Sequence, residues 1–339
     1  MSQSSGSAVA TAEQLFAAGD VYEALHVLAD TNRVAHDPAL EELLVQLSHE
    51  GFRELRRRAI EFVPPSRSPD PVGPLTELAP ADLTPATLRH GLSEHGCVLI
   101  RELVPPARVA GLVTGIDRAL GAFDAGIAGT PVEDTRPWYV PFEPAAGEYR
   151  VGGRRNWVRK GGAMWTADSP RMFFELLELL DEIGIGRLVT EYLGERPALS
   201  ANKCTLRRTP AGPASGDWHQ DGAFLGTDVR SVNFWLALAH CGRDAPGLDI
   251  VPRRMERVLP TGTGGANFDW AVGPDVVREA CGRNGIVRPE FGPGDALLFD
   301  HLFVHRTASE PHMTTERHAM ETWLFAPSTY PQGQIPLVY

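Results

Sequence analysis

Cysteine pairs, long apolar runs and an excess of basic residues are all missing from this 339-residue chain. The four cysteines lie far apart with no Cys-x-x-Cys pair, which argues against a zinc–thiolate site or a disulfide framework. No apolar run reaches the roughly 18 residues of a membrane span, and the first residues lack the basic and apolar regions of a secretory signal. The sequence therefore predicts a cytoplasmic protein with reduced, buried cysteines.

Acidic residues outnumber basic ones by 43 to 32, and the formal net charge is −11. This balance argues against a protein that coats nucleic acid or an anionic membrane, although it leaves room for a local basic pocket. Hydrophobic residues make up 43% of the chain, enough for a sizeable core. The length fits one large domain or two ordinary ones.

Three regions are predicted along the chain. Residues 1–62 are expected to form a helical extension: a Ser-rich, irregular start to about residue 10, then a helical hairpin over residues 11–28 and 37–55. A single hairpin cannot bury its own apolar face, so it should dock on the main domain or on a partner chain, including a second copy of this chain. Residues 63–80 are Pro-rich and predict a linker, and residues 81–339 form the main domain.

The main domain changes character along its length. Helices are expected from about residue 84, over 105–120 and over 170–193, with a short strand at 97–100. After Pro197 short β-type segments follow one another, separated by Gly and Pro. This pattern predicts a mainly β core, a double-stranded β-helix of jelly-roll or cupin type with flanking α-helices.

Residues 121–162 have no regular period and suggest a surface loop or lid. Its aromatic residues, with Trp165 just beyond, are Trp138, Tyr139, Phe142, Tyr149 and Trp157, and its cations are Arg150, Arg154, Arg155, Arg159 and Lys160. Such a lid would present cations to an anionic small-molecule substrate. The alternative is a solvated loop whose charges balance nearby acids.

A metal site is suggested by His219 and Asp221 in the segment WHQD. On a strand, residues two apart point to the same face, so an imidazole and a carboxylate would converge there. His305, after the strand-like DALLFD, is the candidate third ligand. Two histidines and one carboxylate form the set that holds Fe(II) in oxygenases and leaves positions open for a co-substrate and O₂.

Other residues suggest what lies beside the metal. Arg317, twelve residues after His305, could grip a dicarboxylate through two parallel hydrogen bonds, and Thr307 could add a hydroxyl. The alternative for Arg317 is a surface arginine in a charged loop. Asn233 shares one face of its predicted strand with Trp235, and that face is expected to line the cavity.

The segments LRHGLSEHGCVLI, WHQDGAF, VNFWLALAHCGRDAPGLDIVP and GDALLFDHLFVHRT occur in this order and are followed by Arg317. In this combination the chain resembles the phytanoyl-CoA dioxygenase family of Fe(II)/2-oxoglutarate oxygenases, from about residue 88 to about residue 325. The sequence departs from the family at Arg253-Arg254-Met255, where relatives have Gly-Ser-His, and in the spacing to Arg317, which is one residue longer.

The resemblance implies that His219, Asp221 and His305 bind iron and that Arg317 and Thr307 bind 2-oxoglutarate. It also implies that Trp235 lies beside the co-substrate and that Lys160 matches a co-substrate lysine. The implied reaction uses O₂, releases succinate and CO₂, and hydroxylates an unactivated C–H of a small-molecule or acyl substrate. A halogenating relative would have a small residue where this chain has Asp221.

Three alternatives to hydroxylation by this route stay open. The same chemistry can end in desaturation, ring closure or epimerisation. A cupin-type metal enzyme such as an isomerase would need the three ligands but not Arg317. A non-catalytic relative would act as a binding module, with the N-terminal helices contacting its partner.

Overall fold

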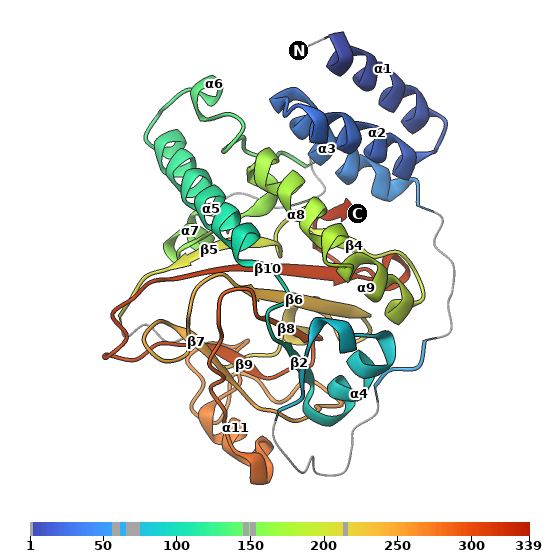
Figure 1. The fold of residues 1–339 in the computed structure, drawn as a ribbon. Helices are drawn as coiled ribbons and strands as arrows, with labels where there is room; N and C mark the ends of the chain where they lie inside the picture. The colour runs from blue at the N-terminus through green and yellow to red at the C-terminus, as the bar shows by residue number, and fades with distance from the viewer. Residues whose placement is uncertain (1–2, 56–61, 66–74, 145–148, 150–153, 213–215) are drawn as a thin grey trace.

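A large mixed β-sheet forms the centre of the protein, as Figure 1 shows for the computed structural model. The structure describes residues 3–55, 62–65, 75–144, 149, 154–212 and 216–339. Helices cover one face of the large sheet, and a small second sheet packs on the other. This arrangement confirms the predicted β core of jelly-roll type with flanking helices.

The large sheet has the strand order β1-β2-β8-β6-β10-β4-β11, and β5 pairs with both β10 and β3. Its strands are β1 (Glu77–Leu78), β2 (Cys97–Ile100), β3 (Ala163–Trp165), β4 (Ala198–Ser200), β5 (Thr205–Thr209), β6 (Ser231–Ala237), β8 (Ala296–Phe299), β10 (Arg317–Phe325) and β11 (Pro336–Val338). All pairs are antiparallel except β1 with β2. The small sheet pairs β7 (Gly247–Ile250) with β9 (His305–Ala308).

Strand alternation separates two cores, and β6 shows how. Val232, Phe234 and Leu236 belong to the core beneath the helices, whereas Trp235 and Ala237 belong to the core between the two sheets. Side chains two apart on a strand share a face, so the predicted division of this strand is confirmed. The space between the sheets is where the functional site lies.

The helices of the main region are α4 (Pro85–His95), α5 (Pro106–Ile127), α6 (Val132–Thr135), α7 (Arg154–Lys160), α8 (Pro170–Glu182), α9 (Ile185–Leu193), α10 (Gly222–Leu225) and α11 (Pro274–Ala280). Local sequence explains several ends. Thr84 and Thr87 form a capping box at the start of α4, with Pro85 in the first turn. The single helix expected over residues 170–193 is wrong, because Gly184 adopts φ +71° and separates α8 from α9.

The expected irregular lid over residues 121–162 contains more helix than predicted. Helix α5 runs on to Ile127, and α6 and α7 follow within the same stretch. Residues 145–148 and 150–153, including Arg150, lie outside the described residues. The aromatic Tyr139 and Phe142 are buried in the core beneath the helices.

Three helices, α1 (Gln3–Ala17), α2 (Val21–Val34) and α3 (Pro38–Glu50), form the N-terminal extension in place of the predicted pair. The irregular start expected for residues 1–10 is wrong from Gln3 onward. The single helix over residues 11–28 is wrong too, because a turn at Gly19, with φ +86°, divides it.

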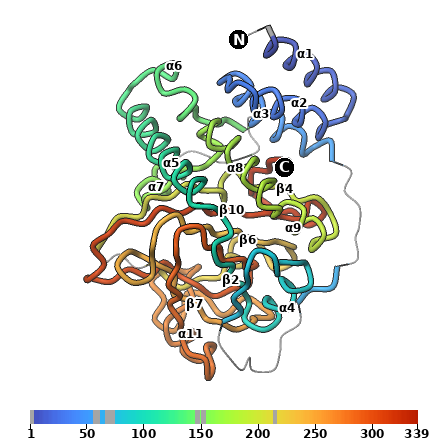
Figure 2. Tube along the Cα trace, in the orientation of Figure 1, coloured from blue at the N-terminus to red at the C-terminus, as the bar shows by residue number. Residues whose placement is uncertain are grey.

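The N-terminal helices dock on the main region rather than standing apart. Figures 1 and 2 show them beside α8 and the C-terminus, and α3 contacts α8 and β11. Their buried residues belong to the same hydrophobic core as those of α8 and β11. At the end of the predicted linker, Glu77 and Leu78 form β1 and pair with β2, so this part of the linker belongs to the sheet.

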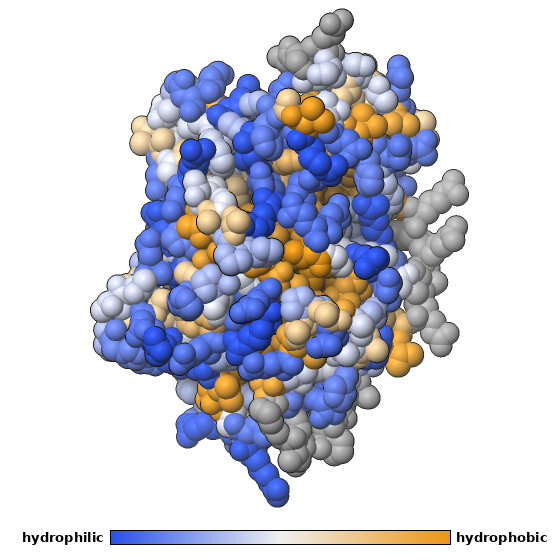
Figure 3. Space-filling model, viewed as in Figure 1, coloured by the Kyte–Doolittle hydropathy of each residue, from blue (hydrophilic) through white to orange (hydrophobic). Residues whose placement is uncertain are grey.

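On the face drawn in Figure 3, mostly hydrophilic residues surround hydrophobic ones near the middle. None of the helices in the described part of the chain has the length and apolar character that crossing a membrane requires.

Candidate metal centre

His219 and His305 are held together by the backbone. The His219 N–H donates to the His305 carbonyl at 3.0 Å, and the His305 N–H donates to the His219 carbonyl at 3.1 Å. This isolated antiparallel bridge continues the small sheet from β9 to the segment that carries His219. The two imidazole rings consequently lie side by side, with ring centroids 4.4 Å apart.

Asp221 joins the two histidines by a route that differs from the prediction. It has helical backbone angles, φ −62° and ψ −23°, and immediately precedes α10, so strand alternation does not explain its direction. A turn after His219 brings the carboxylate round to the imidazoles instead. One ligand atom from each of the three residues lies within 4.8 Å of the others, and His305 Nε2 is 3.8 Å from Asp221 Oδ2.

The donor atoms are oriented for a cation. His219 Nδ1 lies 2.9 Å from the Asp217 carbonyl, and His305 Nδ1 lies 3.2 Å from the Phe303 carbonyl. A carbonyl only accepts, so each Nδ1 carries the hydrogen and each Nε2 keeps its lone pair.

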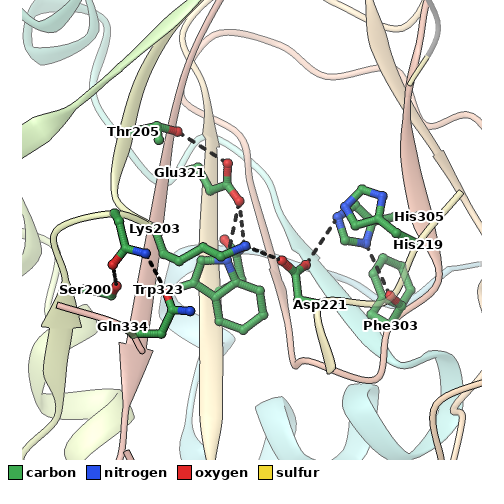
Figure 4. A network of polar contacts seen from close by, with 12 residues as sticks. Ser200, Lys203, Thr205, His219, Asp221, Phe303, His305, Glu321, Trp323 and Gln334 are labelled. Atoms are coloured by element: carbon green, nitrogen blue, oxygen red, sulfur yellow. Dashed lines mark hydrogen bonds and ion pairs between the residues drawn. The ribbon is translucent and has the colours of Figure 1, made fainter. Parts of the chain in front are cut away.

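The Asp221 carboxylate presents one free oxygen to the same point. Lys203 Nζ donates to its Oδ1 at 3.1 Å, while Oδ2 is buried with no hydrogen-bond partner (Figure 4). A buried oxygen without a partner is costly unless something else binds it. The three residues therefore fit a divalent metal ion.

Burial and neighbouring charges set the protonation of these ligands. Burial, with His219 nearby, lowers the pKa of His305 to about 4. Burial alone would raise the pKa of Asp221, but Lys203 and the two histidines outweigh it, and the pKa lies below its ordinary value. At neutral pH the site thus offers a neutral His305 imidazole and a carboxylate, the forms that bind metals.

The site opens into a cavity of about 660 Å³, within the size range of small-molecule sites. Three further predicted residues, Trp235, Thr307 and Arg317, line it. The structure thus brings six of the eight candidate site residues to one cavity.

Arg317 lies at the first position of β10 and is only 1% exposed. Its Nη1 donates to the Gly247 carbonyl at 2.9 Å and its Nη2 to Thr209 Oγ1 at 3.0 Å, whereas Nε has no partner. None of the ion pairs among the described residues includes it, and burial lowers its pKa to about 10. A buried guanidinium without a counter-ion is a ready site for an anion.

The remaining two predicted residues are placed differently. Asn233 is buried and donates to Glu321 Oε1 at 3.4 Å, but it is not among the residues that line the cavity. Lys160 is exposed at the end of α7 and does not line the cavity either. Two lid cations are engaged elsewhere, since Arg155 pairs with Asp168 and Arg159 with Asp124.

Three charged residues that line the cavity were not predicted as site residues. They are Lys203, Arg207 and Glu321. Arg207 and Arg208 are adjacent on β5 and face opposite sides of it. Arg207 binds Glu321 at 2.5 Å, whereas Arg208 binds Asp117 at 3.0 Å. Glu321 sits in an apolar strand an even number of residues from Arg317, and that parity is the sequence signal that could have found it. Lys203 lies in a turn, where no periodicity points to it.

Comparisons with known proteins agree with this geometry. A model of the phytanoyl-CoA dioxygenase (PhyH) family matches residues 92–319. A comparison with curated protein sequences found no match.

Among solved structures, EctD from S. alaskensis, determined with 2-oxoglutarate and 5-hydroxyectoine, is 17% identical, with a TM-score of 0.50 over 80% of this chain and 85% of that one. EvdO2 from Micromonospora carbonacea var. aurantiaca, complexed with 2-oxoglutarate, is also 17% identical, with a TM-score of 0.45 over 75% and 92% of the two chains. The likeness to EctD is one of fold.

The family match covers well over half of the sequence and includes all three candidate ligands. The chain therefore belongs to the phytanoyl-CoA dioxygenase family.

Proposed function

We propose that this protein is an Fe(II)- and 2-oxoglutarate-dependent oxygenase that hydroxylates an unactivated C–H of a small-molecule or acyl substrate. The observation that carries the proposal is a set of two imidazoles and one carboxylate, with Asp221 and His305 buried, in the same cavity as a buried, unpaired arginine. Two histidines and a carboxylate with open positions are the typical ligands of non-haem Fe(II) in oxygenases. EctD, which shares the fold, was crystallised with 2-oxoglutarate.

His219, Asp221 and His305 would hold the iron. Lys203 fixes one oxygen of Asp221 and leaves Oδ2 for the metal, so the carboxylate would bind through a single oxygen. When bound, iron with 2-oxoglutarate and O₂ supplies the oxidant that turns a substrate C–H into C–OH, with succinate and CO₂ as the other products.

Arg317 would hold the carboxylate of 2-oxoglutarate that lies farther from the metal. Its hydrogen bonds to Gly247 and Thr209 fix the guanidinium plane, and its Nε remains free to donate. Thr307 lines the same cavity and can donate a hydroxyl hydrogen to that carboxylate. The Trp235 ring lies beneath the guanidinium, 5.4 Å from its centre, and keeps water from it. These residues would orient the co-substrate, which is a positioning role.

The test is an anaerobic titration of the full chain with Fe(II) and then 2-oxoglutarate, followed by the weak visible charge-transfer band of the complex. The wild-type protein should develop the band. Arg317→Met should bind Fe(II) as before but require at least about 100-fold more 2-oxoglutarate, because two charge-assisted hydrogen bonds are lost.

Arg208→Met is the matched control. Arg208 lies on the face of the sheet opposite to Arg317 and pairs with Asp117. This variant should titrate like the wild type. If the wild-type protein takes up Fe(II) but gives no band, the proposal that 2-oxoglutarate is its co-substrate is refuted. An Arg317→Met variant with unchanged 2-oxoglutarate affinity would favour a metal enzyme that does not use it.

A further inference from the structure

Exposed aromatic side chains gather at the mouth of the metal cavity. Among the described residues, the exposed tryptophans and phenylalanines are Trp157, Phe224, Phe268 and Trp270. All four line this one cavity. Trp157 is 70% exposed and Phe268 is 53% exposed, so neither is explained by packing in the core. Clustered exposed apolar side chains commonly mark a binding surface.

Three separate segments contribute to this aromatic rim, which we define as these four residues. Trp157 comes from α7, Phe224 from α10, and Phe268 and Trp270 from the loop between β7 and α11. Phe268 and Trp270 stack with ring centroids 5.4 Å apart and an angle of 8°, which makes a flat platform. Trp270 also meets the His219 ring edge-on at 6.0 Å, so the platform extends to the metal ligands.

The chemistry of the lining is selective. Among the described residues that line the cavity, six are tryptophans or phenylalanines and one, Leu248, is aliphatic. An alkyl chain would pack equally well on aliphatic side chains, whereas a flat ring gains from stacking on other rings. The rim therefore favours a flat substrate over a flexible chain.

The charges of the described residues that line the cavity balance. Lys203, Arg207 and Arg317 are matched by Asp217, Asp221 and Glu321. Binding a divalent metal and a dicarboxylate would add two charges of each sign and keep that balance. Coulomb attraction would then give no preference for a charged substrate.

We propose that the cavity takes a neutral substrate with a flat, fused ring system, stacked on the aromatic rim so that its edge faces the metal ligands. The proposal rests on the proposed oxygenase function, because it names the substrate class of that same site. It differs from the anionic substrate that the lid cations suggested, and two of those cations are paired with aspartates.

The test compares two neutral probes with the same carbon skeleton, naphthalene-2-methanol and decahydronaphthalene-2-methanol. Only the first is flat. Binding to the full chain loaded with Mn(II) and 2-oxoglutarate is measured by calorimetry. The flat probe should bind about 5-fold more tightly, the order expected for aromatic stacking. Trp157→Ala and Phe268→Ala should each narrow that ratio.

The control is Ile127→Ala, which changes an exposed apolar residue at the end of α5 outside the cavity lining. It should keep the wild-type ratio. Equal affinity for the two probes, binding of neither, or an unchanged ratio in both rim variants overturns the proposal. The protein could instead self-associate, lose that association in Phe268→Ala, and bind both probes equally. That outcome would show that the aromatic rim is a contact between protein molecules.

The two proposals fail separately. A protein that develops the 2-oxoglutarate band but shows no preference for the flat probe refutes the substrate class alone. A protein that prefers the flat probe but never develops the band refutes the oxygenase function alone.

Discussion

His305 is buried between the sheets, against His219, Phe299 and Phe303. Burial lowers its pKa to about 4, well below the value of about 6.5 for an unfolded chain. The folded protein without metal therefore keeps this imidazole neutral over a pH range in which the unfolded chain takes up a proton. Metal binding would need no proton to leave His305 at neutral pH.

This pKa shift predicts a pH-dependent stability of the metal-free protein. Because the folded pKa is the lower one, His305 contributes full stability above about pH 6.5 and loses it as the pH falls toward 4. From pH 7 to pH 5 that loss is about 2 kcal/mol for this one group. Denaturant unfolding in the presence of a chelator measures the free energy of unfolding at both pH values. Between pH 7 and pH 5 this free energy should fall less in His305→Gln than in the wild type, by about the amount that His305 contributes. The His26→Gln variant, changed at an exposed position on α2, should lose stability like the wild type. An equal loss in His305→Gln would show that burial does not lower the pKa of His305.

For single residues, the sequence identified the candidate metal ligands by type and order, but not by geometry. His219 and His305 were found because few residue types bind iron, and their backbone bridge could not be foreseen from either segment alone. Asp221 converges through a turn rather than along a strand, so the predicted contact is present for a different reason. Lys203 was missed because its role depends on a contact with Asp221, eighteen residues further along the chain. No periodic pattern in the sequence indicates that contact.

At the scale of elements, helix α3 is joined to α8 by a buried acid. Glu41 is fully buried and accepts from Arg171 Nε at 2.6 Å and from Asn32 Nδ2 at 3.1 Å. Its neighbour Glu42 is partly buried and pairs with Arg136, whose side chain is 42% exposed. The two adjacent acids therefore hold the N-terminal helices with different strength.

Glu41→Ala is expected to lower the free energy of unfolding by about 2–4 kcal/mol, because Arg171 and Asn32 would lose their partner at a buried contact. Glu42→Ala, next to it, should cost less, about 1 kcal/mol, because its ion pair with Arg136 is partly exposed to solvent. Chemical denaturation of the two variants measures both. Equal losses would show that burial does not distinguish these ion pairs.

Elements with a strong local signal were the ones the sequence predicted. The capping residues Thr84 and Thr87 mark α4, and the apolar segment CVLI marks β2. The breaks at Gly19 and Gly184 were missed because apolar spacing continues through both turns. The first part of α1, up to residue 10, was missed because it is Ser-rich, although Ala8 is buried in the core. Burial in that core outweighs the weak local preference of those residues for a helix.

At the scale of the whole molecule, the chain's organisation depends on contacts that no segment reveals alone. The sequence predicts residues 1–62 as an extension that docks on the main domain or on a partner chain, without saying which. In the structure, Leu28, Leu40 and Leu44 of the extension belong to one hydrophobic core together with Leu176 of α8 and Val338 of β11. A core shared in this way favours unfolding of both regions as one cooperative unit.

That cooperativity predicts that two spectroscopic signals report the same unfolding transition. All seven tryptophans lie at or after position 138, so tryptophan fluorescence reports only the main region, whereas far-ultraviolet circular dichroism also reports α1 to α3. The two signals should give the same midpoint in denaturant. Leu44→Ala, which creates a cavity in α3 far along the chain from any tryptophan, should lower both midpoints together, by about 2–5 kcal/mol in free energy of unfolding. If it shifts only the dichroism signal, the extension unfolds independently and its packing on α8 adds little to the stability of the region that carries the metal site.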